Sequence, residues 1–149
     1  MDLTDELRWL VAQSGVTEGT LHVYCGHTTC GLTINENDSG LDTDMKAVLE
    51  RIAPYSSKHY YAHDKERTPA ERAVHGERDN GHSHARAMVA TYPELTIPVT
   101  ASKLHLGSGK RSCWPSSTDH GHESCWSAPV LKRVTQGRDL GTSRLRLGC

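Results

Sequence analysis

The sequence predicts a single α+β domain, and three observations lead to that class. Apolar residues recur with helical spacing in three segments and alternate with polar residues in others. The strands are few and are mixed with the helices along the chain, which is typical of α+β proteins. No internal repeat is visible, and the length of 149 residues fits one domain.

Three segments have helical spacing. The first covers residues 4–14 and ends before a glycine, which suits a helix C-terminus. The second begins after Asp42 or Thr43, either of which can cap it, and ends before Pro54. The third begins near Ser83. The apolar positions that define the three faces are Leu7, Leu10 and Val11; Met45, Val48, Leu49 and Ile52; and Ala85, Met88, Val89 and Tyr92.

Four shorter segments predict extended structure. Residues 21–25 and 95–99 alternate between apolar and polar side chains, and residues 32–34 and 103–106 are further extended pieces. Residues 55–81 are polar and irregular, which predicts a long loop.

Composition excludes several classes. The net charge is −1, so no global excess of positive charge points to nucleic acid, and no apolar stretch approaches the length of a membrane span. Five cysteines without a signal peptide predict reduced thiols in the cytoplasm, with Cys25 and Cys30 as small buried side chains.

The chain changes character at Gly107. Residues 108–149 hold seven Lys or Arg against three Asp or Glu, whereas the first 107 residues hold ten against fifteen. Helical and strand periodicity also disappears after this point, so the average composition combines two unlike pieces.

The densest polar segment covers residues 27–37. Thr33, Asn35 and Asn37 have the parity to share one strand face with His27, and a histidine beside amides and hydroxyls can hold a phosphate or polarise a bound group. The alternative is a strand end whose polar side chains satisfy turn backbone groups.

A second polar segment covers residues 79–86. With a helix start near Ser83, His82, His84 and Arg86 crowd the first turn, where free N–H groups favour anions. Alternatively, His82 and His84 bind a divalent metal with His63 as a third ligand. An exposed polar cap without a ligand is the third interpretation.

In chain order, these residues resemble a known family. The segment His27-Thr-Thr-Cys-Gly-Leu-Thr-Ile-Asn-Glu-Asn37 is similar to the H-T-[ST]-A-x-L-T-[IV]-N-E-N motif of the YjbQ-like proteins, described as secondary thiamine-phosphate synthase enzymes. The resemblance covers residues 2–107. Its other motifs are Tyr60-Tyr-Ala-His63, Asn80-Gly-His-Ser-His84-Ala-Arg86, Leu95-Thr-Ile-Pro-Val99 and Leu104-His-Leu-Gly107.

The resemblance implies a β-sandwich with helices that assembles as a homotrimer, and a transferase that joins a pyrimidine diphosphate to a thiazole phosphate with release of pyrophosphate. A small phosphorylated metabolite is the expected partner, with neither nucleic acid nor membrane. The catalytic residues it implies are His27, Asn35, Glu36 and His84. The substrate-binding residues are Thr29, Asn37 and Arg86. The alternative is a non-catalytic metal- or phosphometabolite-binding protein, in which His63 and His84 would hold a divalent ion, Mg or Zn.

Three departures from the family pattern concern chain organisation. The family's N-terminal strand is missing before Asp2, residues 64–78 look like an insertion, and the family's apolar strand after L-x-L-G is absent. Reading residues 107–126 in a shifted frame restores the family's Trp-Gln and Asp-Gly-Pro-Arg signatures. We therefore predict a YjbQ-like domain over 1–107, incomplete at both ends, and a frameshifted, disordered tail over 108–149. The chain would then be the non-functional product of a damaged gene, which sequencing the DNA around codon 107 tests.

Overall fold

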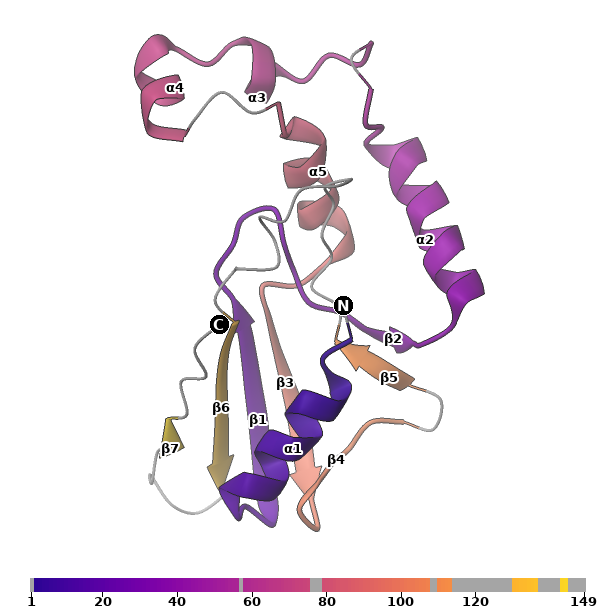
Figure 1. Cartoon of the computed structure of the whole chain (residues 1–149), viewed down its shortest axis with the longest axis vertical. Coiled ribbons are helices and arrows are strands. Elements are labelled where there is room, and N and C mark those ends of the chain that lie inside the picture. Colours follow the sequence, from indigo (N-terminus) through magenta and orange to yellow (C-terminus); the bar gives the residue numbers. More distant parts are fainter. Residues whose placement is uncertain are drawn as a thin grey trace.

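Helices mix with an antiparallel sheet in this chain, which confirms the α+β class (Figure 1). The structure is a computed structural model that describes residues 2–56, 58–75, 79–107, 110–113, 130–136 and 143–144. The helices are α1 (Thr4–Ser14), α2 (Ser39–Ile52), α3 (Ala62–Lys65), α4 (Pro69–His75) and α5 (Gly81–Ala90). The strands are β1 (Glu18–Cys25), β2 (Ile34–Glu36), β3 (Glu94–Thr100), β4 (Lys103–Leu104), β5 (Lys110–Cys113), β6 (Val130–Gln136) and β7 (Ser143–Arg144).

Five strands form the main sheet in the order β4-β3-β1-β6-β7, and β2 pairs separately with β5. Leu21 in the centre of β1 lies opposite Ile97 of β3 and Val134 of β6, and all three pairings around β1 and β3 are antiparallel. Side chains alternate across a strand, so these apolar residues share one face of the sheet.

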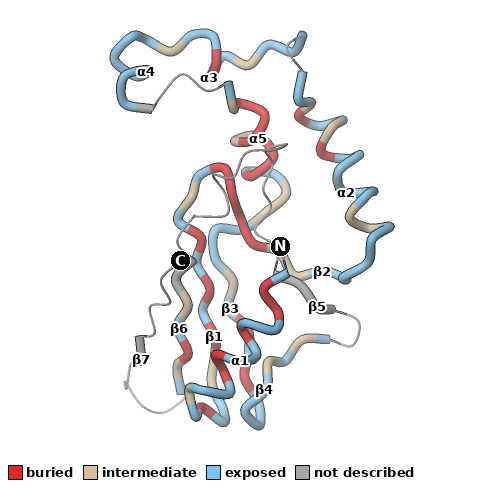
Figure 2. The backbone as a smooth tube through the Cα atoms, in the orientation of Figure 1, coloured by how far each residue is buried: buried red, intermediate tan, exposed pale blue. Residues whose placement is uncertain are grey.

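Helix α1 covers that apolar face. Leu7, Leu10 and Val11 are buried against the sheet in the same hydrophobic cluster as Leu21 and Ile97. Figure 2 shows buried segments along α1 and along β1. The helix has the predicted bounds, and Gly15 ends it in the left-handed conformation that glycine adopts without a steric penalty. This layer of helix on sheet is the main core of the described chain.

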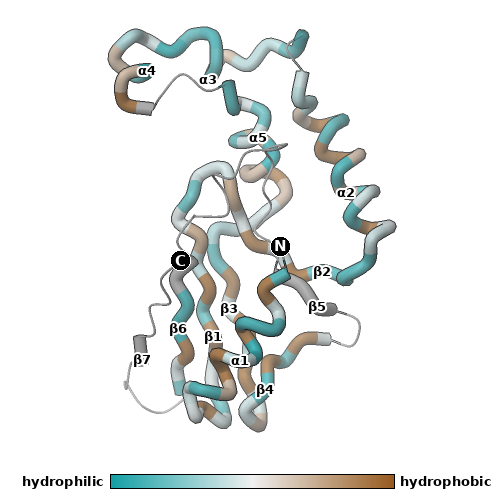
Figure 3. Tube along the Cα trace, in the orientation of Figure 1, coloured by the Kyte–Doolittle hydropathy of each residue, from teal (hydrophilic) through white to brown (hydrophobic). Residues whose placement is uncertain are grey.

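The other helices lie beyond one end of the sheet (Figure 1). Helix α2 begins earlier than predicted because Asp38, and not Asp42 or Thr43, caps it: the Asp38 carboxylate accepts from the backbone N–H of Gly40 at 2.6 Å. Three of its four predicted apolar residues stay exposed, and only Leu49 is buried. Figure 3 shows apolar segments along this solvent-facing helix.

The segment predicted to be an irregular loop contains two short helices, α3 and α4. Thr68 and Glu71 form a reciprocal capping box at the start of α4, in which the Thr68 N–H donates to the Glu71 carboxylate at 2.7 Å and the Glu71 N–H donates to the Thr68 hydroxyl at 3.3 Å. The prediction of an irregular loop was wrong for this segment. Capping interactions stabilise α4, and a helix this short shows little apolar periodicity in the sequence.

The structure places three strands after Gly107, where the sequence predicts no periodic element. Strand β6 pairs with β1 from Gly19 to Cys25, and Val134 is buried in the main core. Most of residues 108–149 lie outside the described ranges, so the domain boundary at Gly107 and the frameshift stay predictions.

Candidate functional site

Two of the histidines singled out in the sequence lie side by side. His63 comes from α3 and His84 from α5, and their ring centroids are 4.4 Å apart at an interplanar angle of 59°. His63 is exposed and His84 is half-buried, so the pair forms an accessible patch of imidazole nitrogens. We call this pair, His63 and His84, the histidine cluster.

A buried carboxylate holds the two helices together. Oδ1 of Asp64, the residue after His63, accepts from the backbone N–H of Asn80 at 3.0 Å and of Gly81 at 2.8 Å. Any residue larger than glycine at position 81 would place its Cβ 2.7 Å from the Cβ of Tyr61. Two carbon atoms that are not bonded to each other cannot approach so closely. The Asn80-Gly81 pair of the family motif therefore allows α5 to start directly against α3.

His27 lies on the loop after β1, and Thr29 fixes its ring. The Thr29 backbone N–H and hydroxyl lie 3.3 and 2.9 Å from Nδ1 of His27. A backbone N–H can only donate, so Nδ1 is the acceptor and the neutral ring carries its proton on Nε2. The charge of His27 also contributes to lowering the pKa of His84.

Arg67 adds a permanent positive charge beside His63. Its Nη2 donates to Nε2 of His63 and, at 3.4 Å, to Oδ1 of Asn80. The same Asn80 oxygen lies 3.2 Å from Nε2 of His63. The exposed edge of His63 is therefore set between a guanidinium and an amide.

The cluster holds His84 in its neutral form. Burial lowers the pKa of His84 from 6.5, and the charges of His63, Arg67 and His27 lower it further, while the charge of Asp64 acts in the opposite direction. The causes other than burial are mostly positive charges. An anion that enters this place would relieve that repulsion and raise the pKa of His84.

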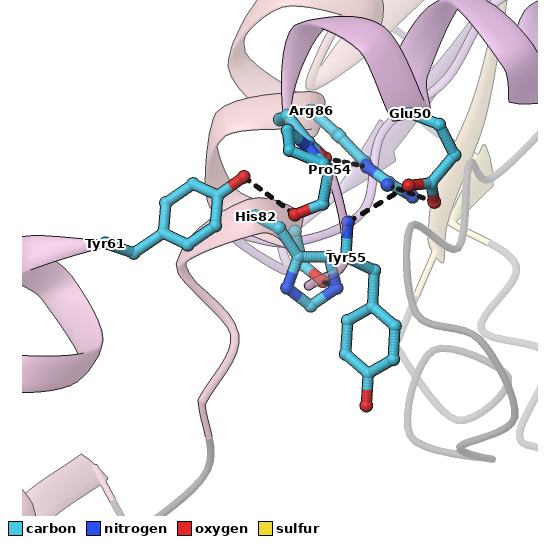
Figure 4. A network of polar contacts seen from close by, with 8 residues as sticks. Glu50, Pro54, Tyr55, Tyr61, His82 and Arg86 are labelled. Carbon is cyan, nitrogen blue, oxygen red and sulfur yellow. Dashed lines mark hydrogen bonds and ion pairs between the residues drawn. The ribbon is translucent and has the colours of Figure 1, made fainter. Parts of the chain in front are cut away.

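Arg86 lies on the other side of α5 from His84. Two residues along an α-helix are separated by a rotation of about 200°. The Arg86 side chain is buried, and its Nε donates to the carbonyl of Ala53 at 2.8 Å while Nη2 pairs with Glu50 at 2.5 Å (Figure 4). The structure therefore separates Arg86 from the histidine cluster and places it where α5 meets the end of α2.

His82 shares the buried side of Arg86. Its ring lies 4.8 Å from the ring of Tyr55 and 6.4 Å from that of Tyr61, and it is hydrogen-bonded to the Ser83 hydroxyl at 3.1 Å. The Tyr61 hydroxyl donates to the carbonyl of Pro54, and burial raises the pKa of Tyr61. The predicted pairing of His82 with His84 and His63 around a metal is thus not the arrangement observed.

The polar residues of β2 lie at another position. Oδ1 of Asn35 accepts from the backbone N–H of Glu36, and the Asn37 amide donates to Asp2 at 2.9 Å. Asn35, Glu36 and Asn37 are exposed, and Asn35 and Glu36 pair with β5. Asn37 thus contacts Asp2, and Asn35 and Glu36 belong to the pair of β2 and β5, whereas His63 and His84 lie on α3 and α5.

Three further findings concern metal ligands, membrane-spanning helices and the cysteines. Among the described residues, no group of three His, Cys, Asp or Glu side chains could hold a metal ion. Within the same ranges, no helix has the length and apolar character needed to cross a membrane. Cys25 and Cys30 are buried, as predicted.

Sequence reasoning missed Arg67 and Asp64. Arg67 is one of several basic residues in a stretch that resembles an insertion, and no local signal marks it. Asp64 follows a motif histidine, but its partners lie 16 and 17 residues further along the chain. Such contacts depend on tertiary structure and leave no short-range pattern.

Together, the fold and the cluster define an α+β protein with an antiparallel sheet and an accessible group of histidines beside an arginine. A family model described as "UPF0047 protein YjbQ-like" matches residues 1–113. The chain therefore belongs to the UPF0047 (YjbQ-like) family.

Relatives and solved structures agree with this assignment. A UPF0047 protein of Methanothermobacter thermautotrophicus is 30% identical over 72% of this chain and 66% of its own length, so the chain spans slightly under two thirds of that relative. One of Archaeoglobus fulgidus is 30% identical over 74% of this chain and 75% of its own length. The crystal structure of an uncharacterized YjbQ/UPF0047 family protein from Clostridium acetobutylicum has a TM-score of 0.68 at 25% identity, over 91% of this chain and 89% of that one.

Proposed function

We propose that the histidine cluster binds the diphosphate of a pyrimidine diphosphate and that the protein has thiamine-phosphate synthase-like activity. The single observation that carries the proposal is the meeting of His63 and His84, 4.4 Å apart, with Arg67 in contact with His63. Imidazolium and guanidinium groups are the side chains that hold phosphate oxygens by charge-assisted hydrogen bonds.

The reaction needs positively charged groups around its leaving group, the pyrophosphate. The bond between the pyrimidine's methylene carbon and the diphosphate oxygen breaks, the pyrophosphate leaves with the electron pair, and the thiazole nitrogen forms the new bond to that carbon. Positive charge aimed at the departing oxygens stabilises the transition state more than the ground state. His84 would take up a proton from solvent as the anion binds, because the anion raises its pKa.

The charge around His63 favours an anion over a divalent cation. Arg67 points a guanidinium nitrogen at Nε2 of His63, the atom that would have to ligate a metal from this exposed edge. A metal at the same place would face a fixed positive charge and would need to displace it. The donor set therefore fits a phosphate better than Mg or Zn, and no step is assigned to a metal.

The positions of the other site residues predicted from the sequence indicate a role for each. Thr29 orients His27, and Arg86 orients α5 through its contacts with Glu50 and Ala53. Asn35, Glu36 and Asn37 lie apart from the histidine cluster within one chain, so we propose that they contact the rest of the substrates from a second copy of the chain. The amides and the carboxylate suit a heterocycle that becomes positively charged during the reaction.

We also propose that the protein assembles as a homotrimer. Met45, Val48 and Ile52 form an exposed apolar stripe along α2, with Ile52 55% exposed. Burying such a stripe against a second copy is favourable at about 25 cal/mol per Å² of apolar surface. Assembly is the expected state of a chain that carries this face in solution.

The activity test uses the purified chain with the pyrimidine diphosphate and the thiazole phosphate. We expect formation of thiamine phosphate and an equal amount of pyrophosphate, with a loss of at least about 100-fold in kcat for His84→Ala. The matched control is His105→Ala, an exposed histidine after β4, which should retain the wild-type rate. Tight binding of pyrophosphate without product would instead assign a non-catalytic phosphometabolite-binding protein.

A further inference from the structure

Arg67 is not among the site residues that the sequence predicts, yet in the fold it contacts His63 of the histidine cluster. It lies between α3 and α4, in residues 64–78, and its Nη2 donates to His63 and Asn80. Arg67 is half-buried, unlike most of the residues around it. The contact is therefore a defined one and not that of a solvated surface arginine.

Several bonds fix the segment that carries Arg67. On one side, Nη2 of Arg72 donates to the Asp64 carbonyl at 3.1 Å, and Lys65 pairs with Asp79 at 2.6 Å. On the other side, the capping box of Thr68 and Glu71 starts α4 immediately after Arg67. The guanidinium is thus held in position before any ligand arrives, which reduces the entropy lost on binding.

The charge of the cluster fits more than one phosphate. An imidazolium, such as protonated His63 or His84, carries one positive charge, and Arg67 always carries one. At neutral pH a single phosphate carries about 1.5 to 2 negative charges, whereas a diphosphate carries more and spreads them over two groups. The guanidinium fork also matches two phosphate oxygens at once, which an imidazole cannot do.

We propose that Arg67 is a phosphate-binding residue that makes the histidine cluster select diphosphates over monophosphates. On binding, Arg67 exchanges its contact with Nε2 of His63 for the terminal phosphate, and the ring of His63 lies beside the same anion. This inference rests on the proposed phosphate-binding function and adds the residue that sets its specificity.

The test is calorimetric titration of the full chain with inorganic pyrophosphate and, separately, with inorganic phosphate. We expect Arg67→Gln to weaken pyrophosphate binding by about 10- to 100-fold and phosphate binding by less than about 3-fold. Arg67→Lys, which keeps the charge but loses the fork, should fall between the two. The matched control is Arg51→Gln, an exposed arginine on α2.

The ratio of the two affinities separates specificity from a structural role, because damage to the fold weakens both ligands together. Equal losses for pyrophosphate and phosphate, or no loss, would overturn the role of Arg67 and leave the proposed function standing. A wild-type chain that binds neither anion would overturn both. Selective loss in Arg67→Gln, together with an inactive wild type, would keep this inference and remove the proposed activity.

Discussion

The carboxylate of Asp64 accepts a hydrogen bond from the backbone N–H of Gly81 at 2.8 Å, and this contact joins the helix of His63 to the helix of His84. The same oxygen accepts from Asn80, and Asp64 is only 6% exposed. The distance between the two histidine rings therefore depends on a residue that touches neither ring in these contacts.

We expect Asp64→Ala to lower the free energy of unfolding by about 2–4 kcal/mol, because two backbone donors lose a charged acceptor. Urea denaturation measures this loss. Asp64→Asn keeps an oxygen acceptor and should cost less, while the pKa of His84 falls further because the charge of Asp64 raises it. A His84 pKa that rises in Asp64→Asn, followed by NMR titration, would contradict the proposed geometry.

His84 should make stability depend on pH. Its folded pKa lies below 6.5, chiefly through burial, so the unfolded chain binds the proton more readily. The stability that neutral His84 provides is fully present above about pH 6.5 and is lost as the pH falls through the lowered folded pKa. We expect the urea midpoint to fall from about pH 7 to about pH 5, and less steeply in His84→Gln. An unchanged slope in that variant, with His105→Gln as control, would argue against a perturbed His84.

Arg86 should contribute mainly to stability. Arg86→Met removes the donors to Ala53 and Glu50, and we expect the free energy of unfolding to fall by about 2–3 kcal/mol. The loss should lie at the lower end of this range because Glu50 is partly exposed. Arg86→Lys keeps the charge and should lose less. A raised KM in Arg86→Lys with unchanged unfolding would instead support the substrate contact that the sequence predicts.

The apolar face of α2 should control assembly. Ile52→Glu places a charge on the most exposed residue of the proposed contact between copies, so we expect the mass measured by light scattering to fall from three chains to one. The neighbouring exposed Arg51→Gln should leave the mass unchanged. A wild-type chain that is already monomeric at micromolar concentration would remove the homotrimer.

Strand β6 offers a test of the segment after Gly107. Val134 is 4% exposed in the main core, so Val134→Ala should cost roughly 2 kcal/mol if β6 pairs with β1 as observed. Arg133→Ala, on the exposed face of the same strand, is the control. If residues 108–149 are instead a disordered tail, both variants will unfold at the wild-type midpoint.

Apolar periodicity predicted the elements that pack by an amphipathic face. Helix α1 has its expected bounds because Leu7, Leu10 and Val11 mark a continuous buried stripe, and β1 and β3 follow the alternation of their side chains. Periodicity failed at α3 and α4, which are set by capping and by contacts with distant residues. It also gave no sign that most of the stripe on α2 would remain exposed.

The sequence by itself determined the family, the α+β class and the histidines of the site, since these depend on local pattern and on motifs in chain order. Tertiary structure alone decided how the site is divided: it placed His84 beside His63 and Arg67, and turned His82 and Arg86 to the opposite side of the same helix. The reason is physical. Residues two apart on a helix face opposite ways, and only the packing of α3 and α2 against α5 determines which side meets which partners.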